Sequence, residues 1–510
     1  MNFGKPSCLA LALALLLTSC GGRTVETPNA TPTPSAAPVQ TAQPLDFVLP
    51  CYPGGGFHPI TGTNRTNLTL APLLYRGLFF VDRQFQAQGD LCESYAVSED
   101  GLTWTFQLAV ASFSDGSPLT SAEAAASLEL ARKSERYASR LSAVSRVTPG
   151  EGSVTVTLSR PSGNLPVLMD VPIVKELSDP LRPLGTGPYF LDGEGDSLHL
   201  SARAGASVPL PGIPLHAIRA SDDLVYAFDA KEVSLIDTDL TGTNALGYSG
   251  RFEITDYPTT TLLYVGFNAQ NGPCRDERVR QAISCAFDRE SVAGKLLAGH
   301  AAASALPVHP GAAEFAAQPV SSLEADPAQA RSLLAEAGWA GEDGAKLRKG
   351  RSGLDLTLAV NLENTYKVSV AETLAETLRS LGCTVTVSKL PWDDFLSALR
   401  KRNFDLFLGE ASLTADFDPE CLVGPAGALN YGGFIDSETN ALLDAWRSAR
   451  GTDRIAAASA LYARLSEMAP FASLCFKNGS LLTQWGQVSG AGPVQWDVFA
   501  GLSGWRIAQF

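Results

Sequence analysis

The sequence lacks the motifs that would indicate catalysis or metal binding. It has no H-E-x-x-H zinc motif, no G-x-x-x-x-G-K-[ST] phosphate loop and no G-x-S-x-G nucleophile turn. Its five histidines show no metal-ligand spacing, and no two cysteines form a C-x-x-C motif. We therefore predict that the protein is not an enzyme and that it holds neither a metal nor a cofactor.

Cysteine use does not indicate a disulfide framework. Cys8 belongs to a predicted targeting segment and Cys20 to a predicted lipid anchor, which leaves seven of the nine cysteines. An odd number cannot all pair within one chain. Most of them are predicted to be small buried side chains, and one or two disulfides stay possible. The seven are Cys51, Cys92, Cys274, Cys285, Cys383, Cys421 and Cys475.

Positive charge is scarce, and no apolar run beyond the N-terminus is long enough for a transmembrane helix. The formal net charge of -14 argues against nucleic acid, whose partners carry a basic surface. With 45% hydrophobic and 18% charged residues, the chain can instead bury a large core. Its length leaves room for two or three domains.

The first nineteen residues are typical of a signal peptide. Lys5 precedes the apolar run Leu9 to Leu17, which is too short to span a bilayer that needs about 20 residues. Leu17-Thr18-Ser19-Cys20 resembles the lipobox of bacterial lipoproteins. This implies cleavage after residue 19 and a lipid on Cys20, at the outer face of the cytoplasmic membrane. An ordinary secretory signal with a chance cysteine is the alternative.

Residues 20–44 are predicted to be a lipidated cysteine followed by a spacer. Thr, Pro and Ala dominate the stretch, and it contains no aromatic residue. Such a composition buries too little apolar surface to fold, and its prolines keep it extended. The spacer would hold the globular body near the membrane.

Local patterns predict several elements of the body. Residues 102–108 alternate as a strand, and 113–116 (FSDG) have turn chemistry. A capping box at 120–123 opens a helix that runs to about Arg132. An apolar stripe over 279–287 predicts a second helix. A third helix is predicted to start at Asp326-Pro327 and to end at Gly338.

The stretch 354–409 predicts the architecture most clearly. Three apolar strands alternate with two helices, the second at about 393–401. This order indicates a mostly parallel sheet covered by helices, in an α/β fold. Such sheets bind ligands beyond the carboxyl ends of their strands. We therefore look for a site in the loop 410–419.

Six segments in order resemble extracellular solute-binding proteins of the peptide, nickel and opine group (family 5), which feed ABC importers. Only the fourth matches the family pattern outright. The segments are 73–78 (LLYRGL), 100–106 (DGLTWTF), 113–120 (FSDGSPLT), 185–189 (GTGPY), 276–282 (DERVRQA) with 288–290 (DRE), and 404–419 with its ADFDP end.

The resemblance implies a two-lobed periplasmic-binding-protein-like fold of type II. Lobe I would combine residues 45–75, 175–262 and 470–510, with an extra subdomain at 76–174. Lobe II would span residues 263–469. The interleaved connectivity of lobe I comes from the family alone, whereas the α/β layering of lobe II follows from its own pattern.

Asp416 is the main candidate ligand-binding residue. In peptide-binding relatives, the aspartate at this position pairs with the ligand's N-terminal ammonium, a charge-assisted bond that is strong in a closed cleft. The alternative is a loop aspartate that bonds its own backbone. Leu413 stands where relatives often carry tryptophan, so an aromatic wall is either missing or supplied elsewhere. The backbone of Leu413, Thr414 and Ala415 is predicted to pair with an extended ligand.

Other candidates lie outside that loop. Trp392 stands where relatives often have tryptophan and either faces the cleft or packs at a helix start. Gly55, Phe57 and His58 belong to a glycine-rich loop at the place of a lobe I ligand loop in relatives. Glycines allow close approach of a backbone to a ligand, or simply a turn. His58 replaces the family's usual aspartate, and a packing or surface role is the more common one for a lone histidine.

The sequence thus predicts a monomeric, membrane-anchored binding component of an ABC importer. Its ligand would be a small solute, most simply a dipeptide or oligopeptide, delivered to a permease and ATPase complex. A nickel complex or an opine is the alternative ligand. A surface sensor of a peptide signal, built on the same fold, is the alternative function.

Overall fold

A computed structural model describes residues 46–508, apart from 178, 244, 246, 316–322 and 342–344. The predicted signal segment, Cys20 and the predicted spacer lie outside the described residues. Everything from Pro44 onward belongs to one unit. Within the described residues, no helix has both the length and the apolar character required to cross a bilayer.

The largest sheet has seven strands in the order β11-β19-β12-β18-β16-β17, with β13 paired to β19. Strands β16, β17 and β18 are parallel, as predicted for 354–409, whereas β12 runs antiparallel to both β18 and β19. The strands are β11 (Leu235–Thr238), β12 (Phe252–Phe267), β13 (Ala301–Ala303), β16 (Asp355–Asn361), β17 (Thr384–Leu390), β18 (Leu406–Ser412) and β19 (Phe471–Gln484). The prediction of a mostly parallel sheet was wrong beyond three strands, because no local pattern reveals pairing between strands distant in sequence.

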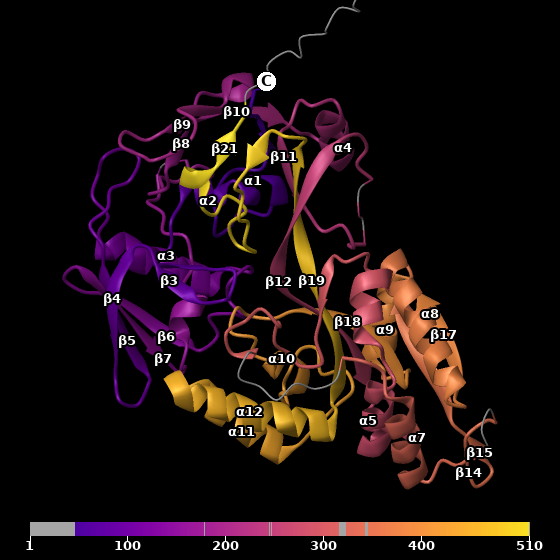
Figure 1. The fold of residues 1–510 in the computed structure, drawn as a ribbon. Coiled ribbons are helices and arrows are strands. Elements are labelled where there is room, and N and C mark those ends of the chain that lie inside the picture. The colour runs from indigo at the N-terminus through magenta and orange to yellow at the C-terminus, as the bar shows by residue number, and fades with distance from the viewer. Residues whose placement is uncertain are drawn as a thin grey trace, which may run out of the picture. The chain divides into compact units, whose positions relative to one another are not determined.

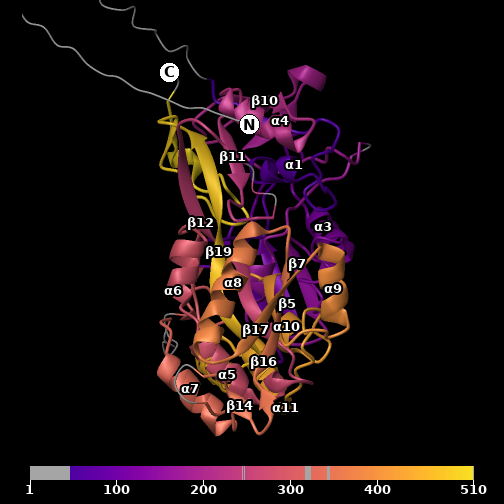
Figure 2. The ribbon, with the colours of Figure 1, turned by 90° about the vertical axis from the view of Figure 1, so that its right-hand side faces the viewer.

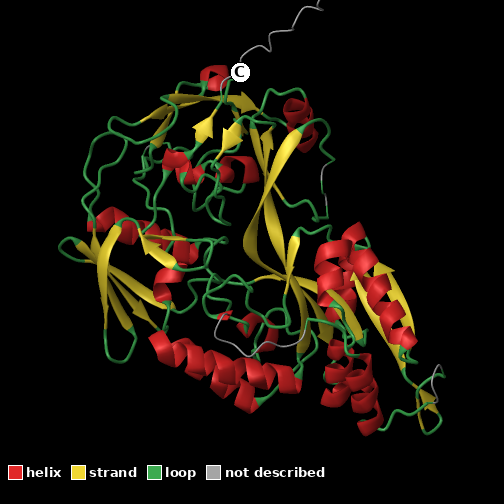
Figure 3. Ribbon diagram, viewed as in Figure 1, coloured by secondary structure: helices red, strands yellow, loops and turns green. Residues whose placement is uncertain are grey.

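Helices α8 (Thr365–Ser380) and α9 (Trp392–Arg400) are the crossovers between the parallel strands. Helix α8 buries Val370, Leu374 and Leu378 in the core beside β16 and β17. It ends where Gly382 adopts a φ of 99°, a left-handed conformation that favours glycine. Figure 3 shows both helices beside this end of the sheet.

Strands β12 and β19 are unusually long, with 16 and 14 residues. Figures 1 and 2 show them side by side, running from the region of β10 and β11 to that of β18 and α8. Their pairing is interrupted between Pro258 and Leu262 by an irregularity in register. Such bulges bend a strand and re-aim its side chains. The two strands therefore connect the region of β10 and β11 with the region of β18 and α8, and they bend between the two.

Two further four-stranded sheets complete the framework, in the orders β1-β10-β9-β8 and β4-β5-β7-β6. Their strands are β1 (Leu49–Cys51), β4 (Cys92–Val97), β5 (Thr103–Leu108), β6 (Val144–Pro149), β7 (Ser153–Leu158), β8 (Tyr189–Asp192), β9 (His199–Ala202) and β10 (Gly212–Ala217). Strand β5 confirms the strand predicted at 102–108. Helix α3 (Ser121–Lys133) lies on the second of these sheets and begins with the predicted capping box of Thr120 and Glu123.

The other predicted helices are confirmed as well. Asp276 caps α5 and Asp326 caps α7, each through its side chain. The remaining elements are α1 (Arg65–Thr69), α2 (Ala71–Leu74), α4 (Ser221–Asp229), α5 (Glu277–Cys285), α6 (Arg289–Ser291), α7 (Pro327–Glu336), α10 (Glu420–Val423), α11 (Ser437–Ser448), α12 (Gly451–Met468), and the paired strands β2 (Phe79–Val81) with β3 (Ala87–Gly89), β14 (Arg348–Lys349) with β15 (Ser352–Gly353), and β20 (Val488–Ser489) with β21 (Arg506–Ile507). The lobe boundaries given above stay a prediction.

The seven cysteines of the described residues are all free thiols, so the disulfides left open by the sequence are not formed among them. Five are buried and two, Cys285 and Cys421, are half-buried. Burial raises the pKa of the Cys383 thiol to about 12. These cysteines are small core side chains, as predicted for most of them.

Candidate ligand-binding site

A polar cavity of about 370 Å³ lies at the bent region of β12 and β19. All three predicted parts of the body contribute to its wall. The lining residues are Thr63, Arg65, Leu68, Thr69, Arg136, Asp237, Thr238, Asp239, Tyr257, Thr259, Thr261, Glu410, Lys477, Asn478, Gly479, Gln495, Trp496 and Val498. Cavities of this size are typical of small-molecule sites.

Lys477 is the most deeply buried charge of this wall, with 3% of its side chain exposed. Its ammonium donates to Asp239 at 2.6 Å and to Glu410 at 3.3 Å. We call these three residues the cavity cluster. Burial by itself lowers the pKa of Lys477, but the two carboxylates outweigh it and raise the pKa overall. The ammonium therefore stays charged beside the cavity.

A third carboxylate of the wall, Asp237, belongs to β11 and is held by hydrogen bonding. Tyr257 donates its hydroxyl to Asp237 at 2.5 Å, and Arg65 lies 3.9 Å away. Burial raises the pKa of the Asp237 carboxyl. The cavity thus offers both an ammonium and carboxylates, which is the complement of a zwitterion.

The chain reaches this arrangement through two local features. Asp237 and Asp239 stand at the end of β11, where the strand stops and its side chains face the cavity. Thr259 and Thr261 lie in the irregular segment of β12, which aims them at the same space. Strand ends and bulges are common places for binding residues.

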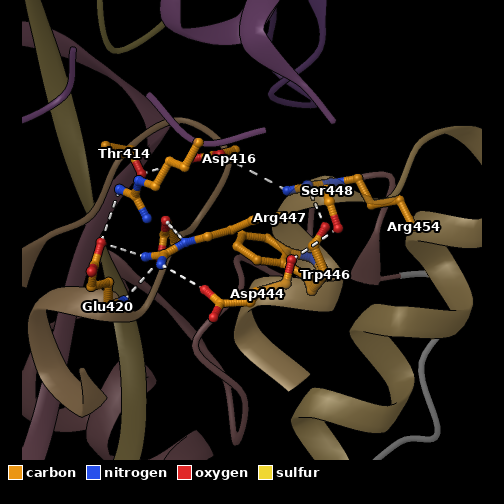
Figure 4. A network of polar contacts seen from close by, with 10 residues as sticks. Thr414, Asp416, Glu420, Asp444, Trp446, Arg447, Ser448 and Arg454 are labelled. Carbon is orange, nitrogen blue, oxygen red and sulfur yellow. Dashed lines mark hydrogen bonds and ion pairs between the residues drawn. The ribbon is translucent and has the colours of Figure 1, made fainter. Parts of the chain in front are cut away.

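Asp416, the main predicted site residue, is not part of this wall. Its carboxylate accepts a hydrogen bond from the Thr414 hydroxyl at 2.6 Å and lies 3.9 Å from Arg454. About 10% of the Asp416 side chain is exposed. Burial raises its pKa, and the charge of Asp418 adds to the rise. Figure 4 shows Thr414 and Asp416 next to each other.

Charged side chains surround that loop and form what we call the loop cluster: Asp416, Asp418, Glu420, Arg447 and Arg454. Arg447 donates to Asp418 at 2.7 and 2.8 Å. It also donates to Glu420 at 2.5 Å, and Figure 4 shows these two side chains facing each other. The guanidinium of Arg454 stacks 4.0 Å from the centre of the Trp446 ring. This cluster ties the loop to α11 and α12.

The loop is also covered from the side of the β2–β3 hairpin. Phe85, at the hairpin tip, packs on Phe417 with ring centroids 4.8 Å apart. Both residues have a positive φ of 59°. Leu413 donates its N–H to the Thr260 carbonyl at 3.0 Å, and its carbonyl accepts from the Thr260 hydroxyl at 2.8 Å. The backbone N–H and carbonyl of Leu413 are thus hydrogen-bonded to Thr260 of β12 and do not form an open strand edge.

The remaining predicted residues do not line the cavity either. Leu413 and Ala415 are buried in an apolar cluster. Trp392 begins α9, is 53% exposed and packs its ring against Phe395. None of the eight residues predicted by name lines the 370 Å³ cavity.

The glycine-rich loop is a compact turn beside α1. Gly55 donates its N–H to the Tyr52 carbonyl at 3.1 Å, and Phe57 is buried. His58 is buried too: its Nε2 lies 3.0 Å from a Glu176 carboxylate oxygen, and its Nδ1 accepts from the backbone of Ile60. The loop supports α1, which in turn carries Arg65 to the cavity.

The range 410–419 was predicted to hold the site, and its first residue, Glu410, lines the wall from the end of β18, but the sequence named none of the wall residues individually. Lys477 had a visible signal, since it is the only charge within the strand FASLCFKNGSLLTQ. Asp237 and Asp239 follow the apolar start of a short strand, the position where strand-end ligand residues occur. Trp496 supplies an aromatic side chain to the wall, although Leu413 replaces the usual tryptophan.

The sequence matches a known protein family over most of its length. A model described as bacterial extracellular solute-binding proteins, family 5 Middle, matches residues 86–426. The chain belongs to this family. The resemblance seen in six sequence segments is thereby confirmed.

Curated relatives of family 5 are distant. A putative ABC transporter peptide-binding protein of Brucella ovis is 28% identical over 327 residues, which cover 57% of this chain and 59% of the relative. A glutathione-binding protein of Shigella flexneri is 24% identical over 313 residues, covering 55% and 59%. The matches thus span about 59% of the length of these relatives.

Solved structures of similar fold cover nearly the whole body. The murein tripeptide-binding protein MppA, in an unliganded open form, gives a TM-score of 0.76 at 20% identity and covers 91% of this chain and 98% of its own. NikZ of Campylobacter jejuni in complex with Ni(L-His) gives 0.65 at 20%, with coverage of 90% and 99%. The oligopeptide-binding protein AppA of Bacillus subtilis, with a nonapeptide, gives 0.62 at 20%, with coverage of 91% and 99%. The two-lobed α/β fold predicted for this chain is confirmed.

Proposed function

We propose that the protein is the substrate-binding component of an ABC importer and that it captures a small zwitterionic solute in the 370 Å³ cavity. The observation that carries the proposal is the cavity cluster, where a buried ammonium and two carboxylates meet at the same wall. A dipeptide or short oligopeptide has the complementary charges. The family assignment supports binding without turnover.

The size of the cavity favours a short solute. Its 370 Å³ lies near the lower end of the range of about 300–1,000 Å³ for small-molecule pockets. An extended peptide of many residues would need more of the molecule to open. We therefore rank dipeptides and tripeptides above longer peptides.

Two sets of carboxylates compete for the ligand's ammonium. Asp416 is proposed by resemblance, together with the backbone of Thr414 and Ala415. The carboxylates of the cavity wall are proposed by position. We favour the cavity wall, because a ligand in that cavity contacts it directly whereas Asp416 lies outside it.

We further propose that the mature protein is a monomer held by a lipid on Cys20 at the outer face of the cytoplasmic membrane. The support is the signal-like segment 1–19 and the Pro/Thr/Ala-rich spacer that follows. Tethering raises the local concentration of a capture protein near its permease and ATPase partners. Mass spectrometry of the purified mature chain should find an N-terminal diacylglycerol-modified cysteine.

Binding is tested with the full mature chain in mild detergent. Thermal-shift screening of dipeptides, tripeptides, nickel complexes and opines would be followed by isothermal titration calorimetry and by chromatography of the recovered ligand. We expect a short peptide to bind with micromolar or tighter affinity and to be recovered unchanged. Chemical conversion of the ligand, or binding of nickel complexes but of no peptide, would contradict the proposal.

A further inference from the structure

A second cavity adjoins the first and has a different character. It measures about 390 Å³ and lies between β1, α1, β11 and α4. Four residues belong to the walls of both cavities: Arg65, Thr69, Asp237 and Thr238. The two cavities therefore meet at these four residues, which come from the two ends of α1 and from the end of β11.

The wall of the second cavity is more apolar than that of the first. The buried residues Leu49, Ile218, Ile236 and Phe499 line it, together with the half-buried Leu224 of α4. Apart from Arg65 and Asp237, which line both cavities, the only charged residue of this wall is Arg219. An apolar space of this size stabilises an apolar group by removing it from water, at about 25 cal/mol per Å² of buried surface.

The partition between the cavities has one fixed and one movable half. Asp237 is held by Tyr257 at 2.5 Å, and 14% of its side chain is exposed. Arg65 reaches Asp237 only at 3.9 Å, and 71% of its side chain is exposed. A long, solvated arginine loses little when it turns away. Its departure would open the Arg65 part of this boundary and leave Asp237, which lines both cavities, without that partner.

We propose that the second cavity is a subsite for a large apolar side chain next to the ammonium group of the ligand. The ammonium takes the place of the Arg65 guanidinium at Asp237, and the side chain on the adjacent carbon enters the apolar space. The ligand's carboxylate then lies on the Lys477 side of the first cavity. This inference rests on the proposed capture of a small zwitterion and specifies which one: a short peptide with an apolar first residue.

The experiment compares two dipeptides of identical composition, Phe-Ala and Ala-Phe, by calorimetry on the full mature chain. They differ only in whether the phenyl group is next to the ammonium or the carboxylate. We expect Phe-Ala to bind at least tenfold more tightly. Equal affinities would overturn the subsite and leave the proposed function standing, whereas no binding of either dipeptide, nor of other short peptides, would overturn both.

Variants that fill the second cavity separate the subsite from general effects. Ala220→Trp places a large side chain at an exposed position of its wall, and Thr66→Trp places one at a half-buried position of α1. Each should remove the preference for Phe-Ala and change Ala-Phe affinity less than threefold. Val110→Trp, at a fully exposed position elsewhere, is the control that should retain the preference. A preference that survives in both filled variants would overturn the inference.

Discussion

The cavity cluster and the loop cluster both lie close to β18, which contains Glu410 and ends shortly before Asp416. Their surroundings differ. The cavity cluster lies beside open space, with Asp239 and Glu410 still 31% and 27% exposed. The loop cluster is packed between α11, α12 and the β2–β3 hairpin, and the side chains of Arg447 and Asp418 are 10% and 18% exposed. The first has room for a ligand at its side. In the second, Arg447 is already bonded to Asp418 and Glu420.

The comparison teaches that burial of charge alone does not identify a binding site. Asp416 combines burial, a raised pKa and a family resemblance, which together would mark it as functional. Structural ion pairs, however, perturb pKa values in the same way. Access to a cavity is the property that distinguishes Lys477 from Arg447.

Loss of Arg447 should have the largest effect. Arg447→Met leaves Asp418 buried without its bidentate partner, so we expect the free energy of unfolding to fall by about 3–5 kcal/mol. Urea unfolding followed by circular dichroism measures this loss. Lys389→Met, which breaks an exposed pair with Glu372, is the control and should cost less than about 1 kcal/mol. Similar losses in the two variants would show that the loop cluster is not structural.

Loss of Lys477 should chiefly affect binding. Lys477→Met removes the ammonium from the cavity wall, and we expect dipeptide affinity to fall about a hundredfold, or about 2.7 kcal/mol. Calorimetry on the folded variant measures it. Lys367→Met is a matched control, because Lys367 also pairs with Glu410, at 2.9 Å, but does not line the cavity. Equal losses from both lysines would remove the special role of the cavity.

Replacement of Asp416 decides between the two clusters. If the ligand's ammonium binds at the cavity wall, Asp416→Ala should change peptide affinity less than threefold. The family resemblance predicts instead at least a tenfold loss. Titration of the same peptide into both proteins distinguishes the two values, and a tenfold loss would assign the ammonium site to the loop.

The pH dependence of stability should also reveal Asp416. Its pKa is raised in the folded protein, so above the unfolded value of about 4 the folded chain retains a proton that the unfolded chain has lost. The contribution of this group to stability therefore falls as pH rises from about 4 through the raised pKa. Asp416→Asn should remove that decline, seen as a flatter plot of unfolding free energy against pH. A plot identical to wild type would contradict the burial of an ionisable group there.

The smallest effect is expected at the edge of the loop cluster. Arg160 lies 3.0 Å from Glu420, and both side chains are more than a third exposed. Arg160→Ala should cost at most about 1 kcal/mol, and the cost should shrink further in 1 M salt. Urea midpoints at low and high salt test this. A loss as large as that of Arg447→Met would mean that the cluster is one cooperative network.

The sequence by itself determined the local elements of this protein. The alternation in β5, the capping box of α3, the stripe of α5 and the strand-helix repeat of β16 to β18 were all readable, because these features depend on neighbours a few residues apart. The family and its two-lobed fold followed from the order of such segments.

The site was decided by the tertiary structure. Lys477 meets Asp239 across 238 positions of the chain, and only the pairing of β19 with β11 and β12 brings them together. Asp416 and Lys477 are both charges in apolar surroundings, and sequence could not say which of them borders empty space. A cavity is what packing leaves unfilled between distant segments, so it exists only once the whole chain has folded.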